Sequence, residues 1–433
     1  MEKFDLKYGK SHFALAVPEE NILQVIEGKS YPGIVDIPAE VKRVLDDPID
    51  SPPLRELVHP GDTVAIVVSD ITRAWIKYPQ ILPPMIDYLN AIGIPDSKIV
   101  IVMALGAHRR HTPEELEMLL TKDLLQRIRV IEHDARDQSQ LTYMGTTSFG
   151  TKVYLNKVVV DADAVILTGG VVYHFMAAYG GGRKSVLPGV AGYTTIQQNH
   201  LLLLYPEGSE VCLNLVDCVS GKPKGNPMHE DQMEITAMLN PAFLVNVVLN
   251  PEGQHAGILA GNYVTAWEKA CRLIDHIYGV PIKEQADLVI ASAGGFPKDM
   301  NLYQTSKTID NASHAVKSGG VVVLLTECKD IKEPPDFAKW FELGGLKGME
   351  KELRRDFTVP GYAALFEVQK ALDATYIVVT LPENAELIKQ VGMIPTTTLE
   401  EAMKIAYAKC PSNPKTIIMP QGANTLPILE QEV

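Results

Sequence analysis

The sequence has few cysteines, and they follow no regular spacing. Only five occur in 433 residues, an odd number, and no two of them form a CxxC pair. Small domains held together by disulfides usually carry an even set of cysteines at characteristic spacings. A disulfide framework is therefore disfavoured, and we expect reduced thiols and a cytoplasmic location.

Positive charge and long apolar runs are also scarce. The 53 Asp and Glu residues outnumber the 40 Lys and Arg residues, which gives a formal net charge of −13. A nucleic-acid surface would need a basic patch, and no uncharged apolar run reaches the roughly 20 residues of a membrane span. The first residues contain no apolar segment typical of a signal peptide. We therefore expect neither a nucleic-acid nor a membrane partner, and an anionic substrate would need a local cationic pocket.

Two common nucleotide-binding motifs are absent as well. No GxGxxG follows a predicted strand, which disfavours a conventionally bound NAD. The residue before Lys184 is Arg183 and not glycine, so the glycine run that precedes it is not a P-loop. The chain is nevertheless long enough for two or three domains with sizeable cores, and its 46% of hydrophobic residues is ordinary for a globular protein.

Short apolar runs that alternate with helical patterns indicate a parallel α/β fold. In the first part of the chain we predict buried strands over residues 63–68, 98–104, 129–132 and 164–167. A second series comprises strands over residues 286–291, 320–326, 376–380 and 415–419. The predicted class is α/β, with two α/β domains, mostly parallel sheets and an active site in the cleft between them. We place an N-terminal domain at residues 1–270 and a Rossmann-like C-terminal domain at 271–410, and we expect 411–433 to return to the first.

Polar residues gather where the predicted strands end. In parallel α/β sheets the ligand lies outside the carboxyl ends of the strands. Asp70, Arg73, His108 and His174 all follow such ends, which predicts one active site there. His133 also follows a strand, but its acidic neighbour favours a structural hydrogen-bonding role.

The stretch from residue 168 to 200 concentrates further candidates. Gly180–Gly182 leave the main chain bare, so that a ligand can approach it closely, and Arg183 and Lys184 follow at once. A lysine beside a second cation is shifted toward its neutral, nucleophilic form. A turn that only binds an anion is the alternative. His200 lies on the helix predicted to follow.

Several motifs together resemble the nickel-dependent lactate racemase family (LarA-like proteins). They are Ser69-Asp70-x-Thr72-Arg73, Gly106-x-His108-Arg109, His174-Phe175, Gly181-Gly182-Arg183-Lys184-Ser185-Val186-Leu187-Pro188-Gly189, His200, Gly294-Gly295-x-Pro297 and Asn301-x-Tyr303-Gln304-x-x-Lys307. The resemblance runs from about residue 60 to the last predicted strand. Among these motifs, the run from Gly181 to Gly189 is the most specific.

This resemblance implies a nickel cofactor, the nickel-pincer nucleotide (pyridinium-3,5-bisthiocarboxylic acid mononucleotide), bound covalently to Lys184 as a thioamide. It implies that His200 is the nickel ligand and that His108 and His174 form an acid–base pair. The implied cofactor-binding residues are Lys184, Asp70, Arg73, Gly182, Arg183, Ser185, Pro188 and Gly189. The implied substrate-binding residues are Arg73, Tyr303, Gln304 and Lys307.

The implied function is a racemase or epimerase of a small 2-hydroxy acid, with lactate as the default, which works by reversible hydride transfer to the cofactor. The alternatives are the same chemistry on malate, a longer or aromatic hydroxy acid or a sugar acid, a Schiff-base enzyme that uses Lys184, and a nucleotide carrier without turnover. A homodimer and the proteins that synthesise the cofactor are the partners considered. Ala74-Trp75 departs from the family's usual proline after Arg73, and the candidates for an aromatic wall of the substrate pocket are Phe357 and Tyr362.

Overall fold

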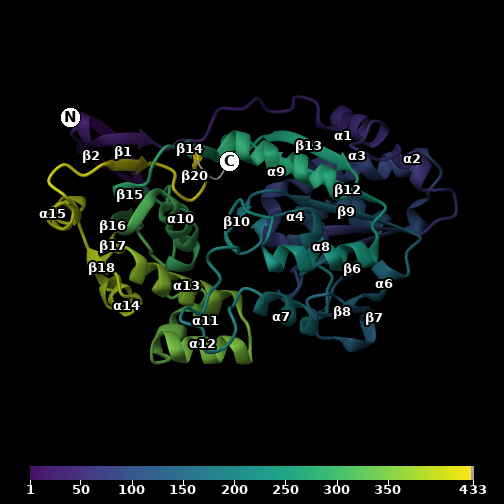
Figure 1. Cartoon of the computed structure of the whole chain (residues 1–433). Coiled ribbons are helices and arrows are strands. Elements are labelled where there is room, and N and C mark those ends of the chain that lie inside the picture. The colour runs from purple at the N-terminus through teal and green to yellow at the C-terminus, as the bar shows by residue number, and fades with distance from the viewer. Residues whose placement is uncertain (431–433) are drawn as a thin grey trace. The chain divides into compact units, whose positions relative to one another are not determined.

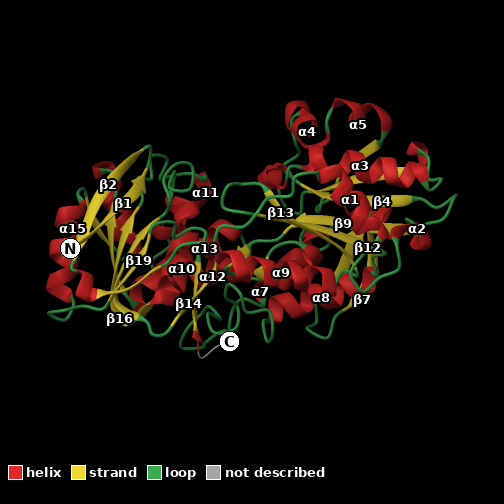
Figure 2. Ribbon diagram, turned by 90° about the horizontal axis from the view of Figure 1, so that it is seen from above, coloured by secondary structure: helices red, strands yellow, loops and turns green. Residues whose placement is uncertain are grey.

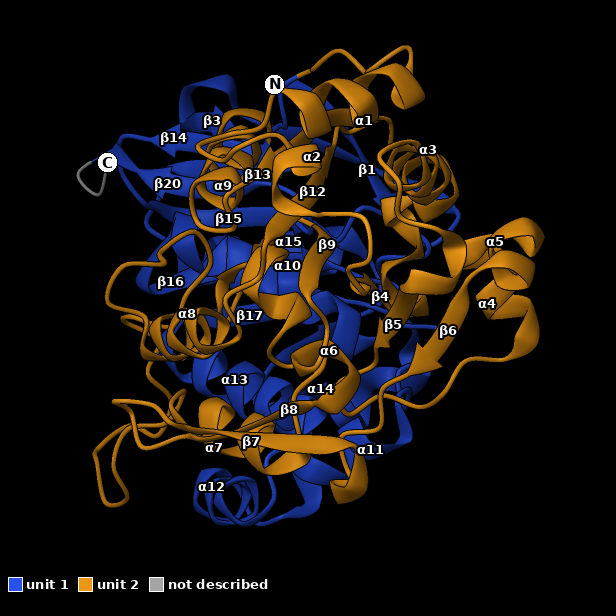
Figure 3. Cartoon of the chain, turned by 90° about the vertical axis from the view of Figure 1, so that its right-hand side faces the viewer, with its two compact units in different colours: residues 1–29, 278–433 blue, residues 30–277 orange. Residues whose placement is uncertain are grey.

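The computed structural model describes residues 1–430 and divides the chain into two compact units. Unit 1 combines residues 1–29 with residues 278–433, and unit 2 spans residues 30–277 (Figure 3). Each unit is built on its own six-stranded sheet. The predicted α/β class with two domains and mostly parallel sheets is confirmed. Among the described helices, none combines the length and the apolar character that crossing a membrane requires.

The sheet of unit 2 has the strand order β13-β12-β9-β4-β5-β6. Its strands are β4 (Val64–Ser69), β5 (Ile99–Ala104), β6 (Arg129–Glu132), β9 (Ala164–Gly170), β12 (Phe243–Leu249) and β13 (His255–Gly261). All neighbours pair in parallel except β12 and β13. The chain runs outward from β4 through β5 to β6 and then returns to place β9 on the other side of β4. This reversal makes the carboxyl ends of β4 and β9 a topological switch point, the usual ligand position in such sheets.

Helices cover both faces of this sheet. Figure 2 shows α1 and α3 on one face and α8 and α9 on the other. The helices of this unit are α1 (Ile37–Asp46), α2 (Leu54–Leu57), α3 (Tyr78–Ala91), α4 (Pro113–Leu120), α5 (Lys122–Arg127), α6 (Lys157–Val160), α7 (Tyr193–Leu201), α8 (Pro227–Leu239) and α9 (Thr265–Tyr278). Two small hairpins, β7 (Leu141–Thr146) with β8 (Lys152–Asn156) and β10 (Tyr173–His174) with β11 (Ala178–Tyr179), complete it.

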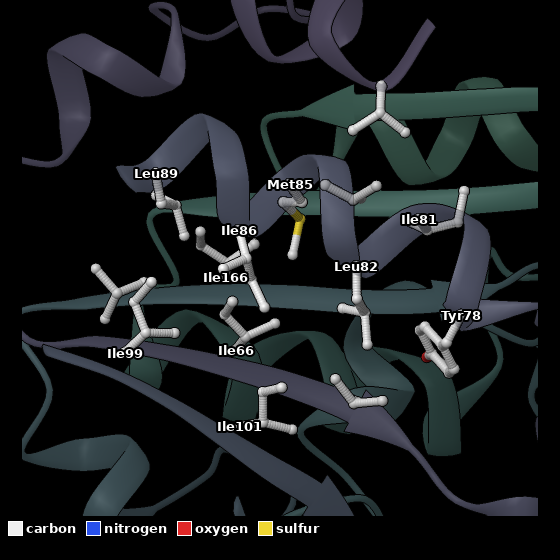
Figure 4. Close-up of a cluster of buried hydrophobic side chains, with 14 of the residues drawn as sticks. Ile66, Tyr78, Ile81, Leu82, Met85, Ile86, Leu89, Ile99, Ile101 and Ile166 are labelled. Atoms are coloured by element: carbon white, nitrogen blue, oxygen red, sulfur yellow. The ribbon is translucent and has the colours of Figure 1, made fainter. Parts of the chain in front are cut away.

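The core beneath α3 shows why this segment is helical. Its buried residues recur at spacings of three and four, so that they form one face (Tyr78, Ile81, Leu82, Met85, Ile86 and Leu89). Figure 4 shows this face packed over Ile66, Ile99, Ile101 and Ile166 of the sheet. Each such fully buried aliphatic side chain contributes about 1.5–3 kcal/mol. The core therefore fixes β4, β5 and β9, whose ends carry the candidate site.

Unit 1 has the strand order β18-β17-β16-β15-β19-β3, and every neighbouring pair is parallel. The strands are β3 (Ile22–Val25), β15 (Ala286–Ser292), β16 (Val316–Leu325), β17 (Thr375–Val379), β18 (Ile394–Thr396) and β19 (Thr416–Met419). The β1 (Glu2–Tyr8) and β2 (Ser11–Val17) hairpin and α15 (Leu399–Lys409) cover one face, as Figure 2 shows. The remaining elements, labelled in Figure 1, are α10 (Leu302–Ala315), α11 (Pro335–Ala338), α12 (Leu346–Arg355), α13 (Val359–Asp373), α14 (Ala385–Val391), β14 (Gly279–Ile282) and β20 (Leu426–Leu429).

The observed division differs from the predicted domains at both ends of the chain. Residues 1–29 were assigned to the N-terminal domain, yet β3 pairs with β19 in the sheet of unit 1. The expected return of residues 411–433 to the N-terminal domain is not what the structure has, because β19 also pairs with β15; residues 431–433 lie outside the described part. The boundary falls at 277/278 rather than near 270, because α9 continues to that point. An apolar strand has no sequence feature that names its partner, so the prediction missed these pairings.

Candidate functional site

Asp70 and His108 meet at the switch point of unit 2. Asp70 follows β4 and is buried, and its Oδ2 lies 2.5 Å from Nδ1 of His108. Burial by itself would raise the pKa of the Asp70 carboxyl, but the hydrogen bond and charge of His108 outweigh it and lower this pKa. A carboxylate can only accept, so Nδ1 of His108 is the donor and its Nε2 is left for acid–base work. The structure thus gives Asp70 a definite role in orienting His108.

Arg73 supplies positive charge to the same region. It lies in the short turn that follows Asp70, and its Nη1 donates to the hydroxyl of Thr72 over 2.7 Å. Its charge helps to lower the pKa values of Asp70, His174 and Lys184. A guanidinium in this place can bind a carboxylate in bidentate fashion.

His174 and Lys184 are in direct contact. Nζ of Lys184 lies 2.8 Å from Nε2 of His174, and Nδ1 of His174 accepts from the backbone amides of Met176 and Ala177, each over 3.3 Å. The pKa of Lys184 is well below its ordinary value, first because the amine is buried and then because of the charges of Arg183 and Arg73. The expected effect of the neighbouring cation is present, although burial is the larger cause.

Two of the glycines before Lys184 occupy positions that have no room for a side chain. Gly181 and Gly182 have φ values of +68° and +52°. A Cβ on Gly182 would lie 2.7 Å from Cδ1 of Trp267, and one on Gly181 would lie 3.0 Å from Oδ1 of Asn246. At these two positions the missing side chains make room for the protein's own side chains.

Arg183 points into the protein. Its side chain is 1% exposed, its Nη2 donates to the carbonyl of Ala177 over 2.5 Å, and its guanidinium stacks 4.3 Å from the ring centre of Trp267. Burial lowers the pKa of Arg183 to about 9. Its side chain therefore braces the loop before Lys184 and adds positive potential.

The residues after Lys184 join its loop to the loop that carries His108. The Ser185 hydroxyl donates to the carbonyl of Thr168 over 2.6 Å, at the end of β9. The carbonyl of Gly189 accepts from the amide of Gly106 over 2.9 Å, and the Cβ of Pro188 lies 3.2 Å from an ideal Cβ on Gly106. A Cβ on Gly189 would lie 2.1 Å from the carbonyl oxygen of Ser185, so this tight turn excludes a side chain.

His200 lies on α7, and its ring is hydrogen-bonded to the backbone of that helix. The side chain is buried, and Nδ1 lies 2.8 Å from the carbonyl oxygen of Ile196. A carbonyl only accepts, so Nδ1 carries the proton and Nε2 keeps its lone pair. Burial, followed by the charge of Lys184, lowers the pKa of His200 to about 4. A neutral imidazole whose other nitrogen is tied to a carbonyl is the form that binds metals.

A buried polar network holds α7, and the sequence did not reveal it. Oδ1 of Asp231 accepts from Thr147 over 2.6 Å, and Oδ2 accepts from Thr151 over 3.0 Å and from Nδ2 of Asn199 over 2.8 Å. Asn199 is the neighbour of His200. Asp231 and its partners come from three separate segments, so no local pattern could have indicated them.

A second missed residue, Asp275 of α9, fixes the hairpin that contains His174. Its Oδ1 accepts from Tyr173 over 2.7 Å and from Tyr179 over 2.8 Å. These tyrosines occupy opposite strands and face each other, with ring centres 5.4 Å apart. One carboxylate therefore anchors both strands of the hairpin.

His133 has the structural role that the sequence favoured. It is buried, its Nε2 lies 2.9 Å from the carbonyl of Ala191, and its Nδ1 lies 3.1 Å from Nδ2 of Asn156. Both ring nitrogens are thus engaged within the protein, and burial lowers the pKa of His133.

The remaining predicted residues lie in unit 1, on α10. The side chain of Asn301 caps this helix by accepting from the amide of Gln304 over 2.8 Å. Nζ of Lys307 donates to Oε1 of Gln304 over 3.1 Å, and the ring of Tyr303 packs edge-on against Phe337 with ring centres 5.7 Å apart. Helical spacing therefore brings the amide and the ammonium group together. Phe357 and Tyr362, the two candidates for an aromatic wall, are both buried with ring centres 6.0 Å apart.

Comparison with protein families shows which family this chain belongs to. Residues 8–211 match the lactate racemase N-terminal domain, and residues 282–426 match the lactate racemase C-terminal domain. The chain belongs to the lactate racemase family. It is thus a racemase of this family, an isomerase, and the family uses a nickel-pincer nucleotide.

Relatives of this family match over nearly the whole chain. A lactate racemase of Thermoanaerobacterium thermosaccharolyticum is 31% identical over 98% of this chain and 99% of its own, and one of Lactiplantibacillus plantarum is 28% identical over 98% and 100%. The structure of the first organism's lactate racemase apoprotein superposes with a TM-score of 0.87 at 30% identity, covering 99% of this chain and 100% of that chain. A Thermotoga maritima protein shares the fold. It superposes with a TM-score of 0.61 at 17% identity, covering 92% of this chain and 100% of that chain.

Proposed function

We propose that this chain interconverts the enantiomers of a small 2-hydroxy acid, with lactate as the first substrate to test, and that it uses a nickel-pincer nucleotide joined to Lys184. The observation that carries the proposal is the contact between Lys184 and His174 beside Arg73 and the Asp70–His108 pair. The proposal takes these groups, which follow the carboxyl ends of neighbouring strands, as the acid, base, cation and nucleophile of one site.

The residues of unit 2 fit this cofactor. Nε2 of His200 keeps a lone pair for nickel because Nδ1 is tied to a backbone carbonyl. Lys184 has a strongly lowered pKa, which is what a covalent attachment through an amine needs. When bound, the nickel-pincer nucleotide supplies the acceptor for a hydride.

The two histidines do the acid–base work in this proposal. The α-hydrogen of a 2-hydroxy acid is a very weak acid because the adjacent carboxylate is already negative, so its removal as hydride while a base takes the hydroxyl proton avoids a dianion. Nε2 of His108 can take that proton, and Asp70 stabilises the resulting imidazolium. Inversion moves the hydroxyl to the opposite side of the carbon. A second acid–base group is then needed there to return a proton to that oxygen, and we assign this role to His174.

The substrate carboxylate needs cations in this acidic protein. Arg73 is one candidate because its charge already acts on Asp70 and His174. Lys307, with Gln304 and Tyr303 on the same helix, is the candidate in unit 1. We propose that these residues select a small hydroxy acid by its carboxylate.

The decisive experiment is a chiral assay of the nickel-loaded holoprotein on a panel of 2-hydroxy acids that begins with lactate and malate. Either enantiomer should approach a racemic mixture, and His108→Ala should slow this by about 10²–10⁴-fold, the usual contribution of acid–base catalysis. With α-deuterated substrate, most label should return to the α-carbon. Inversion of no acid in the panel, or complete loss of label to solvent, would refute the proposal.

A Schiff-base enzyme is the second candidate, and one observation favours it. The amine of Lys184 is held in a form that could attack a carbonyl substrate directly. Borohydride should then trap a 2-keto acid on Lys184 in protein that contains no nickel. Absence of the adduct would exclude this candidate.

A further inference from the structure

The unmodified Lys184 side chain contacts a catalytic histidine, which suggests a task that precedes racemisation. Nζ of Lys184 and Nε2 of His174 are 2.8 Å apart. Racemisation as proposed above gives His174 no reason to contact this amine, because there the histidine serves the substrate hydroxyl. The contact therefore needs its own explanation.

The backbone determines which nitrogen of His174 carries the proton. The amides of Met176 and Ala177 both point at Nδ1, each over 3.3 Å. An amide N–H can only donate, so Nδ1 is an acceptor and the proton of the neutral ring is on Nε2. Nε2–H therefore donates toward Nζ of Lys184.

This direction selects one form of the lysine. A hydrogen bond from Nε2–H needs a lone pair on Nζ, and only the uncharged amine has one. An ammonium would place its own hydrogens against Nε2–H. The charged groups that act on Lys184 are Arg183 and Arg73, and both disfavour an ammonium as well.

We propose that His174 prepares Lys184 for attachment of the cofactor by holding it as a free amine, in addition to its role in racemisation. The inference rests on the proposed function because it assumes the covalent nickel-pincer nucleotide. In the step itself the amine attacks the carbon of a thiocarboxyl group, and a C–N bond forms. The C–O bond of that group breaks, and its oxygen leaves as water with one amine proton and the acid proton. The product is a thioamide, and nothing is oxidised or reduced.

The experiment follows attachment, not turnover. Full-length apoprotein is mixed with purified nickel-pincer nucleotide, and the covalent adduct is followed over time by intact mass. We expect His174→Ala to form the adduct at least tenfold more slowly than the parent. The matched control is His108→Ala, which removes the other catalytic imidazole but no contact to Lys184, and it should form the adduct within twofold of the parental rate.

The outcomes separate this inference from the proposed function. Attachment to His174→Ala at the parental rate overturns the inference, whatever the racemase activity. A parent that inverts hydroxy acids without any adduct also overturns it, and it refutes the covalent link to Lys184, while the proposed interconversion of hydroxy acids stands. An adduct that depends on His174 in a protein that inverts no hydroxy acid supports the inference and refutes the proposed function.

A measurement without cofactor guards against misfolding of the variant. Cyanate carbamylates free amines, and its reaction at Lys184 can be compared in one digest with Lys122, whose side chain is 75% exposed. The ratio of the two rates near pH 7 should fall several-fold in His174→Ala. Removing the ring widens access to Nζ, so a fall cannot come from blocked access. An unchanged or higher ratio would overturn the inference.

Discussion

Replacement of Asp231 should weaken both the fold of unit 2 and its hold on nickel. This buried carboxylate accepts hydrogen bonds from Thr147, Thr151 and Asn199. In Asp231→Ala the two hydroxyls can rotate to new partners, whereas the Asn199 amide keeps only its bond to the carbonyl of Met228, over 3.0 Å. Hydrogen bonds to charged groups contribute about 1.5–3 kcal/mol each, so we expect a loss of about 3 kcal/mol.

Two matched variants make the test specific. In Asp231→Asn the amide can turn so that its oxygen faces Asn199 and its NH₂ donates to Thr147, which keeps the network and limits the loss to about 1 kcal/mol. Glu234→Ala makes the same kind of deletion one turn along α8, at a more exposed residue whose carboxylate binds Ser148. Its expected loss is below about 1 kcal/mol.

The assays are thermal melting and nickel retention. A loss of 3 kcal/mol corresponds to roughly 6–12 °C for a unit of this size. Asn199 precedes His200, the proposed nickel ligand, so Asp231→Ala should also lower nickel affinity. Nickel per chain after dialysis measures this. If Asp231→Ala has the melting temperature of the parent, or if its melting temperature falls no further than that of Asp231→Asn, the hydrogen-bond reasoning is wrong.

Four shorter predictions concern the same unit. Asp70→Asn, which weakens the orientation of its imidazole partner, should lower kcat of the nickel-loaded enzyme by at least about tenfold with little change in KM. Lys184→Ala should show no cofactor adduct by intact mass, and a retained adduct would contradict its role. Gly182→Ala should lower the melting temperature, because its Cβ would lie 2.7 Å from Trp267 and its φ is +52°. The pKa of His133 is lowered by burial from 6.5, so below that pH the unfolded chain binds the proton first and stability falls. Between pH 7.5 and 5 the melting temperature should therefore fall further for the parent than for His133→Gln.

The candidate catalytic residues could be predicted from the sequence, but the side chains that hold them in place could not. His108 and His174 follow strands of a parallel sheet, and Lys184 follows a glycine run, so local patterns were enough to single them out. The carboxylates that fix the site, Asp231 and Asp275, are surrounded by partners scattered along the chain. A sequence without an alignment shows which residues can react, but it does not show which distant side chain meets which.

The glycine run illustrates a second limit. Bare backbone predicts close approach of a ligand, but at Gly182 the absence of a side chain also leaves space for the indole of Trp267. Both explanations call for the same residue type, because both need a position without a side chain. The sequence pattern alone therefore does not distinguish them.

The pairing of β3 with β19 has a practical consequence for dissecting this chain. Residues 30–277 are, in effect, an insertion within a discontinuous partner fold. A truncated gene that starts at codon 278 would turn β19, a fully buried strand, into an edge of the sheet, which invites aggregation. Supplying residues 1–29 as a separate peptide should rescue such a fragment, in the manner of a split protein. Residues 30–277 need no added peptide, because they contain every strand of their own six-stranded sheet.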